Sequence, residues 1–200
     1  MLPEPAESIE QRLLAAALEA ATIHGVTKLS MGDVARRAGL SRQTLYRYFP
    51  SKDALIAAVV GAETTTLIEQ VVGAASSIDD PRGSLEAALL TALRLLRDHP
   101  LLDRLLRTEP ESLLPLLTTE GSPAMIQVRA VVELLVAERS PAAVGADPVA
   151  LRRFADVVTR LIISYAVSAP DDPPELVAHY LSLFLIPDAL DGVAAPEATR

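Results

Sequence analysis

Residues 29–55 read LSMGDVARRAGLSRQTLYRYFPSKDAL and determine how the N-terminal part of the chain folds. Ser30 can accept a hydrogen bond from the first free amides of a short helix that reaches Ala38, and Ser41 can do the same for a second helix. Gly39 between them allows the left-handed backbone of a tight turn. Two short helices joined in this way predict a helix-turn-helix, whose second helix enters the major groove of DNA.

The second of these helices carries polar side chains suited to reading DNA. Arg42 and Gln43 at its start can make paired hydrogen bonds to base edges, with guanine and adenine as their favoured partners. Thr44 can contact a phosphate or the methyl group of thymine. Contacts to phosphates fix the register of a protein on DNA. We expect these contacts from Tyr46, Arg47, Tyr48 and Lys52.

Residues 44–55, TLYRYFPSKDAL, resemble a pattern of the TetR (tetracycline-repressor) family of transcriptional regulators. The family characteristically has threonine, tyrosine, an aromatic residue and phenylalanine in such a run, followed by a short turn and then by lysine, an acid and leucine. The resemblance is specific over residues 9–60 and architectural beyond them. It implies a homodimer on a palindromic, double-stranded operator. It places Gln43, Thr44, Tyr46 and Tyr48 on the DNA and Lys52 on a phosphate.

One position departs from the family pattern. Family members often have threonine where this chain has Met31, and the threonine hydroxyl contacts the DNA backbone. Met31 and Gly32 cannot make that contact, so either Ser30 supplies it or the contact is absent.

The charge of the chain is distributed unevenly along its length. Its formal net charge is -8, which is unusual for a protein that binds phosphates. Between His24 and Asp53, however, there are six basic residues and two acidic ones, whereas the rest of the chain has twelve bases and twenty-four acids. This asymmetry is typical of a small DNA-facing patch on an acidic body.

A period close to that of a helix dominates the whole chain, which predicts an all-α fold of about nine helices. We expect a DNA-binding domain over 1–53 and a ligand-binding and dimerisation domain over 54–200. The first helix should begin at Ala6 or Ser8 and end at Gly25, and a long helix capped by Ser51 should end within 73–77. Turn residues follow over 76–83, and a loop is expected over 139–146.

The C-terminal part should contain six helices separated by prolines and turns. Asp147-Pro148 and Asp172-Pro173 each resemble a helix start, with an acid as the cap and proline in the first turn. Residues 187–200 have little to bury, which indicates a disordered tail. The expected helices run over 84–98, 101–107, 111–117, 124–138, 148–169 and 173–186.

Several side chains of this part could line an effector site. Its apolar, proline-broken sequence indicates a small hydrophobic or amphipathic ligand, whose polar end an arginine could bind inside an apolar pocket. Arginines on leucine-rich helices also cover apolar neighbours with their stems, and core packing explains the aromatic residues equally well. The candidates are Arg94, Arg97, Arg104, Met125, Arg129, Phe154 and Tyr165.

The last two helices carry more apolar residues than one small bundle needs. Paired across a two-fold axis, they would form a four-helix dimer interface that sets the spacing of the two reading helices. The residues concerned are Leu151, Phe154, Val157, Val158, Leu161, Ile162, Tyr165, Leu176, Val177, Tyr180, Leu181 and Phe184.

Other kinds of function have little support in the sequence. The chain has no cysteine, its three histidines are not spaced to hold a metal, and no pattern of a nucleophile or phosphate loop is present, so we expect neither an enzyme nor a cofactor. We read no signal sequence and no membrane span, which indicates a cytoplasmic protein. The resemblance implies a repressor that a hydrophobic small-molecule ligand releases from its operator. A small-molecule-binding protein without DNA recognition, a protein-interaction adaptor and an activator remain as alternatives.

Overall fold

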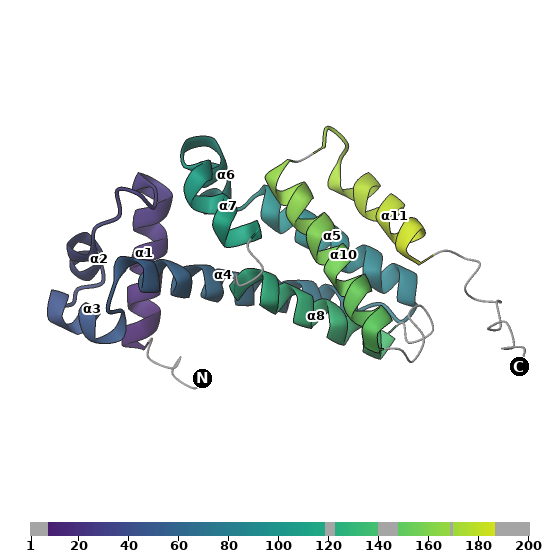
Figure 1. Cartoon of the computed structure of the whole chain (residues 1–200), viewed down its shortest axis with the longest axis horizontal. Helices are drawn as coiled ribbons and strands as arrows, with labels where there is room; N and C mark the ends of the chain where they lie inside the picture. Colours follow the sequence, from purple (N-terminus) through teal and green to yellow (C-terminus); the bar gives the residue numbers. More distant parts are fainter. Residues whose placement is uncertain (1–7, 119–122, 140–147, 169, 187–200) are drawn as a thin grey trace, which may run out of the picture. The chain divides into compact units, whose positions relative to one another are not determined.

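The computed structural model describes residues 8–118, 123–139, 148–168 and 170–186. Within these ranges the chain forms ten helices and no strand, which confirms the predicted all-α class. The chain divides into two compact units (Figure 1). Unit 1 contains residues 1–66 and 97–127, and unit 2 contains 67–96 and 128–200.

Unit 1 begins with helix α1, Ile9–His24, which starts and ends where the sequence predicts. The Ser8 hydroxyl accepts from the amide of Gln11, and the Gln11 side chain accepts from the Ser8 amide in return. Gly25 ends the helix with a φ of 84°, a conformation that side chains with a Cβ rarely adopt. Along α1, Leu13, Ala17 and Ala21 face the core.

Helices α2, Met31–Arg37, and α3, Arg42–Tyr48, form the predicted helix-turn-helix. Gly39 has the expected left-handed conformation, with a φ of 65°, and lets the chain reverse between them. Arg12 of α1 donates a hydrogen bond of 2.6 Å to the carbonyl of Ala38, at the end of α2. This contact ties the end of α2 to α1.

Two further helices complete unit 1 together with the start of α4, Lys52–Ser76. Helix α6, Pro100–Thr108, and helix α7, Pro110–Thr118, extend slightly beyond the ranges expected for them. The cap residues of α6 also contact other parts of the unit. His99 accepts from the amide of Leu102 through Nδ1, and its Nε2 lies 3.1 Å from Oε2 of Glu63 on α4.

Unit 2 is built from helices α5, Pro81–Arg97, α8, Pro123–Arg139, α10, Pro148–Val167, and α11, Pro174–Leu185. The first residues of α8 and the last residue of α5 belong to unit 1. All four helices contribute to one apolar core. Each Å² of apolar surface that the core removes from water stabilises the fold by about 25 cal/mol. Its members are Leu89, Leu93, Val132, Val136, Ala155, Val158, Val177 and Ala178.

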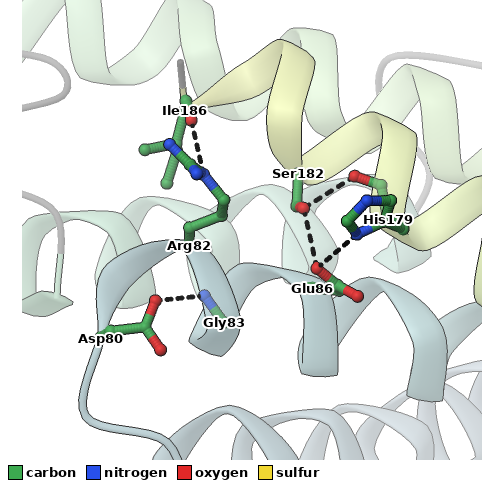
Figure 2. Close-up of polar contacts among 7 residues, drawn as sticks. All are labelled: Asp80, Arg82, Gly83, Glu86, His179, Ser182 and Ile186. Atoms are coloured by element: carbon green, nitrogen blue, oxygen red, sulfur yellow. Dashed lines mark hydrogen bonds and ion pairs between the residues drawn. The ribbon is translucent and has the colours of Figure 1, made fainter. Parts of the chain in front are cut away.

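Polar contacts add to this core where α11 lies against α5 (Figure 2). The Ser182 hydroxyl donates to Oε2 of Glu86 and lies 2.8 Å from the carbonyl of His179. The same Glu86 oxygen lies 3.2 Å from Nδ1 of His179. Near the start of α5, Nε of Arg82 donates to the carbonyl of Ile186, just after α11. These contacts therefore join the first turns of α5 to the C-terminal end of α11.

Two predicted helix starts are wrong. Helix α5 begins at Pro81 and not at Ser84, because Asp80 caps it by accepting from the amide of Gly83. Helix α11 begins at Pro174, with Pro173 as its N-cap and no side-chain cap hydrogen bond. Since the residue before a proline avoids helical geometry, Pro174 keeps Pro173 extended and leaves Asp172 outside the helix.

Helix α4 ends at Ser76, within the predicted range, and the Ser51 hydroxyl accepts from the amide of Ala54. By length and composition it is the one helix, among those described, that could cross a membrane, a test that core helices also pass. Its Leu55 and Val59 are buried. Arg139, expected to begin a loop over 139–146, is instead the last residue of α8. The rest of that loop and the expected tail over 187–200, together with Ala6, Asp147 and Ala169, lie outside the described residues.

Candidate nucleic-acid interface

Helix α3 has one buried face and one exposed, polar face. Leu45 is completely buried and Phe49 nearly so, and together they fix the helix on α1 and α2. The side chains of Arg42, Gln43, Tyr46, Arg47 and Tyr48 are exposed, and Thr44 is half-buried. The structure therefore brings the predicted reading residues together on one short helix, with their polar atoms available to a ligand.

The start of α3 is fixed by side-chain hydroxyls. Ser41 accepts from the amide of Thr44 at 3.0 Å, and the two hydroxyl oxygens lie 2.9 Å apart. Ser30 accepts from the amide of Asp33 and caps α2 in the same way. These serines therefore order the helix starts, and because each is exposed, a hydroxyl can also meet a phosphate.

Gly32 provides space for the side chain of Arg42. A Cβ at position 32 would lie 2.3 Å from Nη2 of Arg42 and 2.6 Å from its Nε, so the guanidinium passes close over the backbone of α2. The sequence indicates Gly32 only as a departure from the family pattern. Its structural role is to leave room for this approach of the Arg42 guanidinium to α2.

The aromatic residues of α3 have different surroundings. Tyr46 and Tyr48 both expose a large part of their rings, as expected for residues whose hydroxyls contact phosphates. The guanidinium carbon of Arg47 lies 5.6 Å from the centre of the Tyr48 ring. This cation–π distance keeps a positive charge beside the tyrosine.

Lys52, the first residue of α4, has a partner that the sequence does not predict. Its Nζ donates a hydrogen bond of 2.7 Å to the carbonyl of Thr27, in the loop between α1 and α2. An ammonium group has three N–H donors, so this contact leaves others for a phosphate. Lys52 is thereby held by the loop and not only by its own helix.

Glu109, between α6 and α7, binds the same loop from another direction. Its Oε2 accepts from the amide of Thr27 at 2.7 Å and from the Thr27 hydroxyl at 2.8 Å. A Cβ at Gly25 would lie 1.8 Å from Oε1, so only glycine fits here. Burial by itself would raise the pKa of Glu109. The hydrogen bonds from Thr27 and the amide of Val26, together with the charge of Arg104, outweigh burial and hold the pKa below its usual 4.5.

We expect Glu109→Gln to lower the free energy of unfolding by about 2 kcal/mol at pH 7, because the donors of Thr27 and Val26 lose their charged acceptor. The folded pKa of Glu109 lies below the unfolded value of 4.5. Its contribution is therefore complete above the unfolded pKa and is lost as the pH falls through the folded pKa. Urea unfolding of both proteins at pH 7 and below pH 4 measures this.

Exposed Glu111 on α7 provides the control, since Glu111→Gln should change stability little at either pH. The difference between wild type and Glu109→Gln should shrink as the pH is lowered. A difference that stays constant with pH would contradict the assignment of the carboxylate charge to this contact.

The candidate effector residues are distributed over both units. Arg97, Arg104 and Met125 belong to unit 1, and Arg94, Arg129, Phe154 and Tyr165 belong to unit 2. Arg94 forms an ion pair with Glu175 on the surface of unit 2, and Phe154 and Tyr165 pack against the unit 2 core. Met125 is buried, and Arg129 is half-buried.

Arg104 has a feature that the other candidates lack. Its Nε atom is buried, and within the described part of the chain no hydrogen-bond acceptor reaches it. A buried donor without a partner has a cost of about 1–3 kcal/mol, which a ligand can relieve. Unit 2 contains a hollow of about 520 Å³, which Arg104 does not line. Its lining residues include Tyr165, Val177, Tyr180, Leu181, Leu183 and Phe184.

Two family models match the chain over nearly all of these elements. The model for bacterial regulatory proteins of the tetR family matches residues 13–59, and the model for the C-terminal domain of the bacterial tetracycline repressor matches residues 80–187. The chain belongs to the TetR family. As a member, it is a DNA-binding transcriptional regulator and not an enzyme.

Individual relatives are similar over different lengths. An uncharacterized HTH-type regulator of Mycobacterium tuberculosis is 36% identical over 96 residues, so the alignment spans about half of each chain (48% of both). The regulator AlkX of the same organism is 28% identical over 166 residues, 80% of this chain and 75% of the relative.

Solved structures of TetR-family proteins share the fold. The repressor AlkX from a Dietzia strain, implicated in the biodegradation of n-alkanes, has a TM-score of 0.74 at 24% identity and covers 94% of this chain and 98% of its own. FadR from Bacillus subtilis, solved with stearoyl-CoA, has a TM-score of 0.61 at 13% identity over 88% of this chain and 97% of its own.

Sequence reasoning missed Thr27 and Glu109. Glu109 precedes Pro110 and so had to leave helical geometry, which is a local signal for a break between α6 and α7. Nothing local, however, indicates its partner 82 residues earlier.

Proposed function

We propose that the protein is a homodimeric repressor that binds a palindromic operator and leaves it when a long-chain, apolar effector binds. The observation that supports operator recognition is the exposed polar face of α3 over a fully buried Leu45. We assign residues 1–53 to DNA binding and 54–200 to effector binding and dimerisation, with no membrane partner and a cytoplasmic location.

The proposed DNA contacts divide into two kinds. Arg42 and Gln43 read base edges, because they are exposed at the end of α3 that enters the groove first. The remaining candidates hold the sugar-phosphate backbone. They are Ser30, Ser41, Thr44, Tyr46, Arg47, Tyr48 and Lys52.

The class of effector is proposed from the relatives and from Arg104. AlkX of Dietzia is implicated in n-alkane biodegradation, and FadR of Bacillus subtilis was solved with stearoyl-CoA. Both relate to long aliphatic chains, which suit an apolar helical domain. The buried, unpartnered Nε of Arg104 supports an anionic group, such as a carboxylate, at the end of the effector.

The dimer interface is proposed on α10 and α11 of unit 2. Val158 and Val177 of the predicted interface residues face the unit's own core, whereas Val157, Leu176, Tyr180 and Phe184 expose much of their side chains. Phe184 is 79% exposed beside the 520 Å³ hollow. In an isologous interface, each Phe184 can enter the hollow of its partner.

The test of the proposed function has two stages. Selection of bound duplexes from a random pool should yield a palindrome with half-sites about one helical turn apart, and its affinity should fall as salt is raised. Stearoyl-CoA, stearate and hexadecane are then added in turn to the complex.

The proposal is supported if at least one of these probes releases the wild-type protein from the operator. It also requires that the anionic probes, stearoyl-CoA and stearate, release the Arg104→Met variant less effectively. Binding without sequence preference would favour the alternative, a small-molecule-binding protein without operator recognition. Retention of the operator at saturating concentrations of all three probes would contradict the proposed effector class.

A further inference from the structure

A chain of hydrogen bonds joins α6, the loop between α1 and α2, and the first residue of α4. Glu109 accepts from the amide and the hydroxyl of Thr27, and the carbonyl of the same Thr27 accepts from Nζ of Lys52. All three residues belong to unit 1. One residue of the loop is thus held on both sides, by an acid from one direction and by a base from the other.

The loop is shaped to receive this carboxylate. A Cβ at Gly25, whose φ is 84°, would collide with Oε1 of Glu109. The amides of Val26 and Thr27 both donate hydrogen bonds to the Glu109 carboxylate. Successive backbone amides that converge in this way form an anion-binding concavity. Here a side chain of the protein occupies it, and Glu109 is only 8% exposed.

Burying a carboxylate has a cost that its hydrogen bonds must offset. The loop between α1 and α2 has six residues, 25–30, and an apolar contact could hold it without this cost. The arrangement fixes the carbonyl of Thr27, and with it the Lys52 ammonium group, at a defined place beside α3. The position of the carboxylate and the position of Lys52 are therefore linked.

We propose that Glu109 is a positioning residue for DNA binding, which acts through Thr27 to place Lys52 on the operator phosphate. This inference rests on the proposed function, because it requires that Lys52 contact DNA. A displacement of the α6–α7 junction would carry the carboxylate away from Thr27 and leave Lys52 without its fixed acceptor. The junction thus controls one phosphate contact in each half-site.

A double-mutant cycle between Glu109 and Lys52 tests this route. With the full-length protein and the selected operator, Lys52→Met should weaken binding at least tenfold, the loss expected for a charged hydrogen bond. In the dimer it should also reduce the salt slope by about two, because one phosphate contact is lost in each half-site. Glu109→Gln should weaken binding and reduce the slope in the wild-type background, and do neither when Lys52 is already methionine.

Thr27 supplies a second pair of variants that leaves the carboxylate in place. Thr27→Val removes the hydroxyl donor and should reproduce part of the Glu109→Gln effect, whereas Thr27→Ser keeps both donors and should bind as wild type does. Thermal melting, monitored by circular dichroism, shows which variants are folded at the assay temperature. The Thr27 pair keeps the inference testable if Glu109→Gln does not fold.

The outcomes separate the inference from the function on which it rests. Equal losses from Glu109→Gln with and without Lys52 would overturn the inference, and so would unchanged salt dependence in folded Glu109→Gln. In both cases, selective operator binding by the wild type would leave the proposed function standing. Wild-type protein that shows no preference for any duplex would overturn the operator proposal, and the inference with it.

Discussion

Replacing Arg42 and Gln43 with alanine is expected to abolish selective operator binding while the protein remains folded. Both side chains are exposed at the start of α3, and the core contacts of the helix come from Leu45 and Phe49. Each paired contact to a base provides about 1–3 kcal/mol of discrimination, so loss of both should remove about 2–6 kcal/mol in each half-site. Fluorescence anisotropy with operator and scrambled duplexes measures the difference.

The control for this double variant is Arg107→Ala on α6. Arg107 is exposed and paired with Asp103, so its loss removes a positive charge from the same unit without touching α3. We expect Arg107→Ala to keep the preference for the operator. If the Arg42, Gln43 variant still distinguishes operator from scrambled DNA, base reading must be assigned to other residues.

The second large effect is expected from Phe184→Glu. Phe184 is the most exposed large apolar side chain of those described, and in an isologous interface the substitution places two carboxylates at the centre of apolar contacts. A central interface residue contributes about 2 kcal/mol or more, so the doubled loss of about 4 kcal/mol should weaken the dimer roughly a thousandfold. Sedimentation equilibrium should show a folded monomer with greatly reduced operator affinity.

Leu134→Glu on α8 provides the matched control. Leu134 is, like Phe184, an exposed apolar residue of unit 2, but it lies outside the two helices assigned to the interface. It should remain dimeric at the same protein concentration. A dimeric Phe184→Glu together with a monomeric Leu134→Glu would move the interface from α11 to α8.

The parts of the fold that follow from short sequence patterns were predicted correctly. The pattern predicts Gly25 as the end of the first helix and Gly39 as a tight turn, and both have a positive φ, because glycine after an apolar helical pattern is a local signal for such a conformation. The helix starts at Ser30, Ser41 and Ser51 are local in the same sense, since each hydroxyl binds an amide three residues ahead.

Competing local signals led to the errors in helix starts. Asp80-Pro81 and Asp172-Pro173 look alike as acid-proline pairs, but a second proline follows only the latter. Pro174 therefore moves the start of α11 by one residue, while the turn residues around Pro81 concealed an ordinary acid cap.

The residues of the candidate DNA interface can be predicted from the sequence, whereas the partners that these residues contact within the protein cannot. The exposed residues of α3 follow from helical periodicity, because Leu45 and Phe49 are one turn apart and define the buried face. The partners of Lys52 and Arg42 depend on tertiary structure. Thr27 is 25 residues from Lys52, and Gly32 on α2 lies ten residues before Arg42 on α3, whose guanidinium approaches it.

Helix α6 has a fixed length for a physical reason. His99 at its start and Glu109 at its end are its two caps, and each also binds another part of unit 1, at Glu63 and at Thr27. One inserted residue would turn Glu109 by about 100° around the helix axis and shift it by about 1.5 Å. The number of residues from 99 to 109 therefore sets how the two caps are oriented relative to each other around the helix axis, so an insertion within α6 would separate one cap from its partner.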